Sequence, residues 1–147
     1  MSDPPKLLGV YLFVRDLPRS LAFYKLLGLT IENVSGMFAR ATMPNGVTIE
    51  FGTSELTLSY DPNWQAPSGP GTNTINFELP SRDAVDAMYA SLTAAGHVGH
   101  LVPCDALWGA RFALVDDPDA NVVGLHSPRD RSAERERERA LRMTHRS

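Results

Sequence analysis

Glu50 is the acidic residue of this sequence that is best suited to chemistry. It lies between Ile49 and Phe51, a setting typical of a β-strand, where the side chain is expected to be partly withdrawn from water. A carboxylate in such a place can act as a general base or can pair with a cation on a ligand. Two other roles stay open, because Glu50 can instead form an ion pair with Arg40 or reach solvent.

Histidines form the second group of candidates. His97 and His100 have a His-x-x-His spacing, but residues three apart on a strand point to opposite faces, so this pair is not expected to bind one metal ion. His126 belongs to the last apolar segment and can be either a proton carrier or a hydrogen-bonded structural residue.

Aromatic residues are the third group. Trp64 and Trp108 can stack on a flat or cationic ligand, or they can cover a loop or part of the core. Phe38 and Phe112 stand at equivalent positions of an internal repeat and are expected to serve mainly in packing.

These residues fall on segments whose patterns predict strands and helices. Leu7 to Val14 is a β-branched and aromatic run of strand length, and a helix follows that Asp16 caps and Gly28 ends. Further strands of the first half are expected at 30–34, 37–43 and 47–51. The pair Asn45-Gly46 between the last two is typical of a type I′ hairpin turn.

The second half repeats this order. A strand at 74–79 alternates apolar and polar residues, and a helix follows that Ser81 caps and Gly96 ends. Three more strands are expected at 97–102, 108–115 and 122–126. Residues 54–72, rich in proline, glycine and polar residues, predict a long connecting loop between the halves.

The two halves can be superimposed as sequences. Placing Pro44 on Pro118 also puts Phe38 on Phe112 and Glu50 on Gly124. Each half therefore reads β-α-β-β-β. Because one such unit cannot bury its sheet alone, the two sheets are expected to curl together or to exchange with those of a second chain.

Composition limits the class of protein. The chain has 147 residues, 43% hydrophobic and 21% charged, values that fit one globular domain. Its apolar segments have strand length and its first residues lack the pattern of a secretion signal, so a cytoplasmic protein without membrane contact is expected. The net charge of −3 combines an acidic body with an arginine-rich tail from Arg129. The acidic body argues against a nucleic-acid partner, because phosphate binding needs a cationic face. The tail itself predicts a solvated helix or a disordered end.

Two motifs resemble those of a known superfamily. They are VRDLPRSLAFY at 14–24, followed by LLGL at 26–29, and DPDANVVGL at 117–125. The chain is similar there to the vicinal oxygen chelate superfamily of glyoxalases, bleomycin-resistance proteins and extradiol dioxygenases. The resemblance covers about residues 6–128 and implies an α+β fold, in which two βαβββ modules form a curled mixed sheet with a cup-shaped pocket. The chain is therefore expected to consist of one domain, 1–128, followed by a charged tail at 129–147. Within the domain, the two modules are expected at about 6–53 and 73–127.

The resemblance also indicates where a metal would be held. Metalloenzymes of this superfamily place a ligand on the first and last strand of each half, which corresponds here to Gly9, Glu50, Thr74 and Gly124. Glycine has no donor atom, and a threonine hydroxyl is a poor ligand for zinc, nickel or iron. No metal and no other cofactor is therefore predicted.

If those four positions face the cup, strand alternation places aromatic and polar side chains on the same concave side. With Trp64 from the connection, the expected ligand-binding residues are Tyr11, Phe13, Phe38, Arg40, Glu50, Trp64, Thr74, Asn76, Trp108, Phe112 and His126. An aromatic pocket with a few polar groups is typical of a small-molecule site.

Three functions are compatible with such a cup. The first hypothesis is a metal-independent, homodimeric protein that sequesters an aromatic or cationic compound, as the resemblance to the bleomycin-resistance branch implies. The second is a small metal-free lyase, isomerase or cyclase, with Glu50 as general base and Arg40 or Asn76 stabilising an oxyanion. The third is an interaction module whose cup is filled by its own side chains. Whether the protein is an enzyme stays open at this point.

Overall fold

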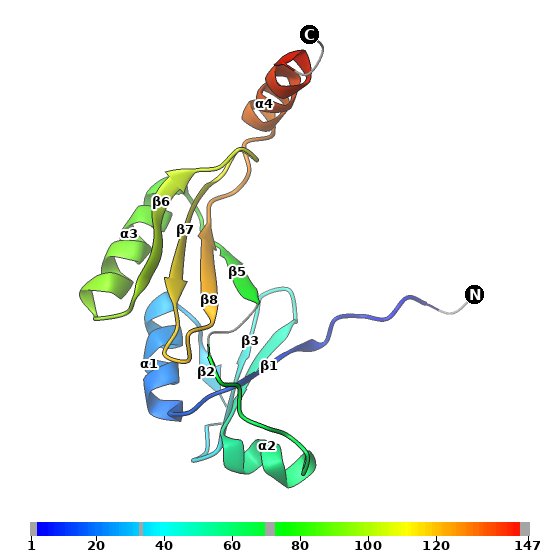
Figure 1. Cartoon of the computed structure of the whole chain (residues 1–147), viewed down its shortest axis with the longest axis vertical. Helices are drawn as coiled ribbons and strands as arrows, with labels where there is room; N and C mark the ends of the chain where they lie inside the picture. The colour runs from blue at the N-terminus through cyan, green and yellow to red at the C-terminus, as the bar shows by residue number, and fades with distance from the viewer. Residues whose placement is uncertain (1–2, 33, 70–72, 145–147) are drawn as a thin grey trace. The chain divides into compact units, whose positions relative to one another are not determined.

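The chain folds into two compact units, Met1–Pro70 and Gly71–Ser147, each with its own sheet (Figure 1). The computed structural model describes residues 3–32, 34–69 and 73–144, and only the backbone of 131–137. Unit 1 contains β1 (Gly9–Phe13), α1 (Leu17–Leu27), β2 (Ile31–Glu32), β3 (Phe38–Thr42), β4 (Thr48–Gly52) and α2 (Ser54–Tyr60). Unit 2 contains β5 (Thr74–Glu78), α3 (Arg82–Ala94), β6 (Gly99–Asp105), β7 (Arg111–Asp116), β8 (Val122–His126) and α4 (Arg131–Thr144).

The two sheets have the same topology. Their strand orders are β1-β4-β3-β2 and β5-β8-β7-β6. In each sheet the first pair is parallel and the other pairs are antiparallel. The predicted α+β fold of two βαβββ modules with mixed sheets is therefore confirmed, and each sheet is open.

The internal repeat also holds at the level of strand register. Phe38 lies opposite Gly52 in unit 1, and Phe112 lies opposite His126 in unit 2. Likewise Glu50 pairs with Tyr11, and Gly124 pairs with Asn76. Equivalent sequence positions thus occupy equivalent places in the two sheets.

Side-chain alternation gives the sheet of unit 2 two different faces. Ala113 and Val115 of β7 and Val123 and Leu125 of β8 are fully buried, and α3 packs against these strands (Figure 1). The residues that alternate with them along these strands, which include Phe112 and His126, point to the other face. That second face carries the candidate site.

Unit 1 has the same alternation. Ala39, Ala41, Ile49 and Phe51 of β3 and β4 are buried. Tyr24 of α1 packs its ring at 4.9 Å from the ring of Phe51. The intervening residues of these strands are only half-buried, and they include Arg40 and Glu50.

The predicted helix caps are present. The Asp16 side chain accepts a hydrogen bond from the backbone N–H of Arg19, and the Ser81 hydroxyl accepts one from the N–H of Ala84. Gly28 ends α1 with φ of +112°, a conformation that glycine adopts without steric cost. Each signal lies within one turn of the helix end, which explains why the sequence alone revealed it.

The connection between the modules was predicted to be a long loop, but it is not wholly irregular. Its first part forms α2, which Thr53 caps by accepting a hydrogen bond from the N–H of Leu56. The helix has only seven residues, so its apolar positions are too few to show a helical period.

Several predicted strand limits also change. β6 extends to Asp105 through Pro103, which is possible because β6 is an edge strand with an irregular register. β7 begins at Arg111, so Trp108 lies in the preceding turn rather than on the strand. β2 is reduced to Ile31–Glu32, and Asn33 lies outside the described residues.

The predicted hairpin between β3 and β4 forms with a different turn. Only Gly46, and not Asn45, has positive φ among these loop residues, whereas a type I′ turn needs both. In unit 2, Ala120 stands at the equivalent place with φ of +62°. The two hairpins therefore share a loop that ends in one left-handed residue.

The tail forms the helix α4, one of its two predicted states, with an ion pair between Glu138 and Arg142.

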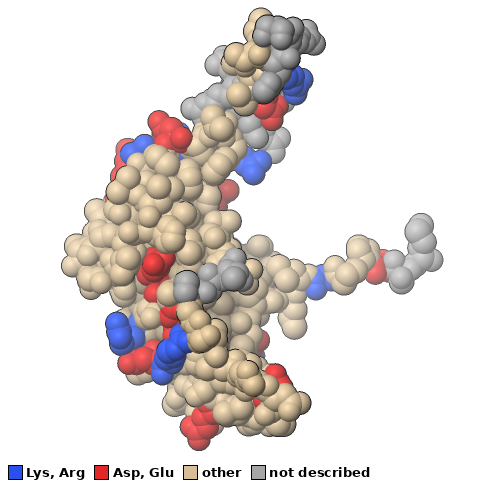
Figure 2. Space-filling view, viewed as in Figure 1, with Lys and Arg blue, Asp and Glu red and all other residues tan. Residues whose placement is uncertain are grey.

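Among the described residues, none of the helices combines the length and the apolar character needed to cross a lipid bilayer. Figure 2 shows acidic and basic side chains interspersed on the visible face.

Candidate ligand-binding site

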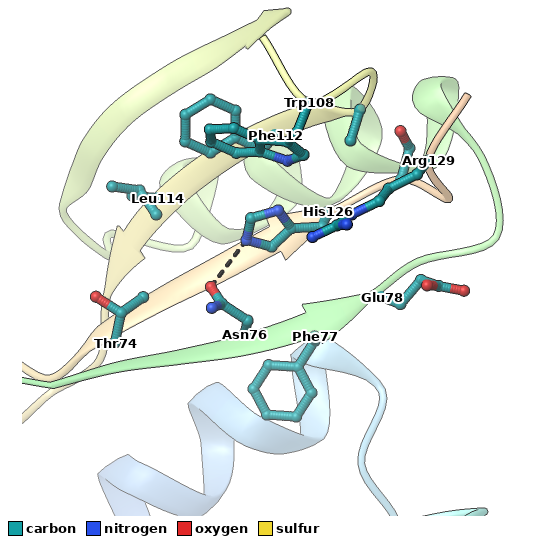
Figure 3. Close-up of a pocket in the computed structure, with 11 residues that line it drawn as sticks. Thr74, Asn76, Phe77, Glu78, Trp108, Phe112, Leu114, His126 and Arg129 are labelled. Atoms are coloured by element: carbon teal, nitrogen blue, oxygen red, sulfur yellow. Dashed lines mark hydrogen bonds between the residues drawn. The ribbon is translucent and has the colours of Figure 1, made fainter. Parts of the chain in front are cut away.

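A pocket of about 560 Å³ lies on the sheet of unit 2 (Figure 3). Its volume is within the range of small-molecule sites. It is lined by Thr74, Asn76, Phe77, Glu78, Trp108, Ala110, Phe112, Leu114, His126, Ser127 and Arg129.

Three aromatic rings form one wall of this pocket. The Phe112 ring stacks on the His126 imidazole, with 5.6 Å between centroids and 15° between planes. Trp108 adds a third ring, 4.9 Å from Phe112 and 6.3 Å from His126. The antiparallel register of β7 and β8 causes this stacking, because it places Phe112 opposite His126.

Trp108 reaches the wall from a tight turn. The backbone N–H of Ala106 donates to the carbonyl of Ala110, and Gly109 has φ of +84°, which suits glycine. Trp108 remains partly exposed, with a relative accessibility of 36% for the whole residue. A large ring that is held in place and partly exposed can stack on a ligand.

The polar side of the pocket centres on His126. Its Nε2 lies 2.8 Å from Oδ1 of Asn76, and in this orientation of the amide Nε2 donates its proton to the oxygen. The basic nitrogen of the neutral ring is then Nδ1. Burial lowers the pKa of His126, and the positive charge of Arg129 lowers it further; both effects favour the neutral ring.

Gly124 makes this hydrogen bond possible. It lies on β8 beside Asn76 and two residues before His126. A Cβ atom added at Gly124 would overlap Oδ1 of Asn76 and Nε2 of His126. The two side chains therefore meet in space that any other residue at this position would occupy.

In unit 1, Arg40 and Glu50 form an ion pair, with 3.1 Å between Nη2 of Arg40 and Oε2 of Glu50. This is one of the alternatives that the sequence left open for Glu50. The Arg40 guanidinium also lies 5.4 Å from the centre of the Phe38 ring. Tyr11 is the neighbour of Glu50 on β1; it bonds to Thr57 of α2 through their hydroxyls at 2.9 Å, and burial raises its pKa.

The connection after α2 folds back onto β1. The Trp64 ring lies 4.6 Å from the ring of Phe13, and Arg15 donates a hydrogen bond to the carbonyl of Pro67. Trp64 thus packs on an aromatic side chain of its own unit, which is one of the two roles considered for it.

The residues implied by the resemblance do not fit the superfamily's metal site. Gly9 has no ligating atom, and a Cβ there would overlap the backbone oxygen of Thr48. Gly124 is equally without a donor, the carboxylate of Glu50 is paired with Arg40, and Thr74 offers only a hydroxyl. In the described part of the chain, no three His, Cys, Asp or Glu side chains are grouped as metal ligands would be. His100 pairs with Asp116.

The predicted site residues therefore fall into two sets. Unit 2 brings together Thr74, Asn76, Trp108, Phe112 and His126, whereas Tyr11, Phe13, Phe38, Arg40, Glu50 and Trp64 belong to unit 1. Glu78 and Leu114 also line the pocket. Strand alternation places Glu78 on the same face as Asn76, and it could have revealed Leu114 in the same way. Ser127 and Arg129 follow the end of β8, where no periodic signal exists.

Two βαβββ repeats with identical strand order define the class of this protein. Residues 6–125 match the family model of the Glyoxalase/Bleomycin resistance protein/Dioxygenase superfamily, and the chain belongs to this superfamily. The predicted resemblance is thereby confirmed. A comparison with curated proteins gives no significant match.

Solved structures of the same superfamily share the fold. A glyoxalase/bleomycin resistance protein/dioxygenase from Nocardioides is 24% identical, with a TM-score of 0.71 over 88% of this chain and 87% of that chain. A family enzyme from Burkholderia phytofirmans PsJN is 24% identical, with a TM-score of 0.72 over 84% and 98%. A glyoxalase-related enzyme from Fulvimarina pelagi is 19% identical, with a TM-score of 0.75 over 84% and 88%. At these identities the likeness concerns the fold.

Proposed function

We propose that this protein binds a flat aromatic small molecule in the pocket of unit 2, without a resident metal ion. The observation that carries the proposal is the wall of Trp108, Phe112 and His126 along a pocket of about 560 Å³. Aromatic side chains on such a wall bury the face of a ligand ring and contribute directional stacking. Glu78 and Arg129 also line the pocket, so it contains one acidic and one basic side chain beside the aromatic wall.

Three of the four expected positions, Gly9, Thr74 and Gly124, lack a suitable ligand, which supports the metal-independent form of the proposal. Glu50 is the single carboxylate at these positions, and it is paired with Arg40. One carboxylate does not bind a transition metal tightly. We expect elemental analysis of the purified protein to show far less than one metal ion per chain. A stoichiometric metal would contradict this part of the proposal.

Calorimetric titration with naphthalene derivatives tests the binding itself. We expect Trp108→Ala to weaken binding by about 10- to 100-fold, as the loss of a large stacking residue does. Leu107→Ala is a matched control, because Leu107 is an exposed apolar residue of the same turn that does not line the pocket. Equal affinities of both variants and the unmodified protein would contradict the proposal.

The second candidate is a metal-free enzyme with Glu50 as general base. It is favoured by the position of Glu50 on a half-buried sheet face, opposite Tyr11 of β1. Glu50→Gln separates the two functions: an enzyme loses turnover and keeps affinity, whereas a binding protein keeps its affinity and shows no turnover before or after the change.

We also propose that the protein forms a homodimer, since each four-stranded sheet is open and an open edge can be covered by a second copy. Light scattering on the full chain should give twice the mass of one chain. A monomer at working concentrations would contradict this proposal.

A further inference from the structure

The polar side of the unit 2 pocket restricts which aromatic ligands it would accept; this inference rests on the proposed binding function. Nε2 of His126 is already engaged with Asn76. The neutral ring has one more nitrogen, Nδ1, which accepts a hydrogen bond but cannot donate one. Among the described residues, Nδ1 has no hydrogen-bonding partner. His126 lines the pocket, and its imidazole therefore has an unused acceptor.

The aromatic wall places a ligand next to this acceptor. Phe112 is stacked on one face of the imidazole, and the Trp108 ring is centred 6.3 Å from it. Figure 3 shows Asn76 on one side of the His126 ring and both Trp108 and Phe112 on the other. A flat ligand that lies against Trp108 thus presents its edge near His126.

Asn76 fixes the tautomer that creates the acceptor. An imidazole in water exchanges its proton between the two nitrogens, and a hydrogen bond from one nitrogen decides which of them keeps the proton. Because the amide oxygen of Asn76 accepts from Nε2, the lone pair stays on Nδ1. Gly124 in turn leaves the space in which the two side chains meet.

We propose that the Asn76–His126 pair selects aromatic ligands that carry a hydrogen-bond donor on the ring, such as a phenolic hydroxyl or a ring N–H. Gly124, which the resemblance places at a metal-ligand position, would then serve a different purpose. The space beside it holds the hydrogen-bonded pair that recognises the ligand edge.

Two probes of nearly equal ring surface test this selection. 2-Naphthol has a donor hydroxyl, whereas 2-methoxynaphthalene has only an acceptor oxygen. We expect calorimetry at pH 7.5 to show about 5- to 12-fold tighter binding of 2-naphthol, the factor expected for one hydrogen bond. Equal binding of both probes would overturn the selection and leave the proposed function intact. Binding of neither probe would overturn both.

Variants then assign the preference to the pair. His126→Phe keeps an aromatic ring and removes the acceptor, so the preference for 2-naphthol over 2-methoxynaphthalene should disappear. His100→Phe is the matched control. His100 of β6 pairs with Asp116 of β7 and does not line the pocket. This variant should keep the full preference. A preference that survives in His126→Phe would overturn the inference.

Gly124→Ala tests the role of the pair without changing either partner. The atoms that a new Cβ would meet are the ends of two side chains, which can move aside while the sheet stays folded. We expect this variant to show native circular dichroism and a preference reduced to about twofold or less. Native folding with an unchanged preference would contradict the role assigned to the pair.

Discussion

Arg40 and Glu50 lie directly opposite each other on β3 and β4, and their side chains form an ion pair of 3.1 Å. Both are partly accessible, at 38% and 30% of the side-chain surface. The Arg40 guanidinium also lies 5.4 Å from the centre of the Phe38 ring. A substrate that used Glu50 as its base would first have to separate it from Arg40.

The contribution of this ion pair to stability can be measured with a double-mutant cycle. We expect Arg40→Met and Glu50→Gln to show a coupling of about 0.5–1 kcal/mol in the free energy of unfolding, because the pair is half-exposed and lies directly cross-strand. Urea denaturation of the four proteins gives this value. The coupling should fall in 1 M salt; a coupling near zero at low salt would show that the pair does not stabilise the sheet.

The lowered pKa of His126 predicts how stability depends on pH. Burial and the charge of Arg129 disfavour the protonated ring in the folded state, so the unfolded chain binds the proton more readily. This contribution is fully present above the unfolded value of about 6.5 and is lost as the pH falls through the lower folded value.

Proton NMR of the imidazole groups checks this prediction directly. The titration midpoint of His126 should lie below about 6.5, and His126→Phe should reduce the loss of stability between neutral and mildly acidic pH. Glu78 is the register neighbour of His126 on β5, and its charge opposes the shift. A midpoint at or above the ordinary histidine value would refute the stated cause.

Ala120 occupies a left-handed backbone conformation with φ of +62°. A residue with a Cβ atom pays a steric cost there that glycine avoids. We expect Ala120→Gly to raise the free energy of unfolding by about 0.5–1 kcal/mol after the greater flexibility of unfolded glycine is counted.

The first hairpin offers the opposite change as a control. Gly46 stands at the equivalent position with φ of +88°, so Gly46→Ala should lower stability by about 1 kcal/mol. Denaturant titrations of the two variants compare these effects. Shifts of the same sign in both would disprove the conformational argument.

Gly9 and Gly124 should differ in their tolerance of a methyl group. A Cβ at Gly9 would meet the backbone oxygen of Thr48, which cannot move without disturbing the β1–β4 pairing. At Gly124 it would meet only side-chain ends. We expect Gly9→Ala to cost about 2–3 kcal/mol and Gly124→Ala about 1 kcal/mol, measured by urea denaturation. The reverse order would show that the strands yield more easily than the side chains.

The βαβββ repeat could be predicted because its signals are local. The caps at Asp16 and Ser81 and the Pro44 and Pro118 turns each depend on a few neighbouring residues. Alternation along each strand likewise assigns a side chain to one face of the sheet. These signals sufficed for the fold, although they missed α2, whose seven residues are too few to show a period.

The position of Trp108 shows where local signals end. Its neighbours favour a strand, yet the turn from Ala106 to Ala110 holds it outside β7. Turn geometry there depends on Gly109, whose φ of +84° cannot be deduced from an apolar run. The predicted strand placed Trp108 on the same face as Phe112, and in the structure the two rings lie 4.9 Å apart.

The sequence by itself determined which residues can share a face: Arg40 with Glu50 in one sheet, and Asn76 with His126 in the other. Only the tertiary structure decided that each of these two pairs is in direct contact. The physical reason is that alternation is a property of one strand, whereas contact depends on the register between strands and on free space. At Gly124 that space exists because a side chain is missing.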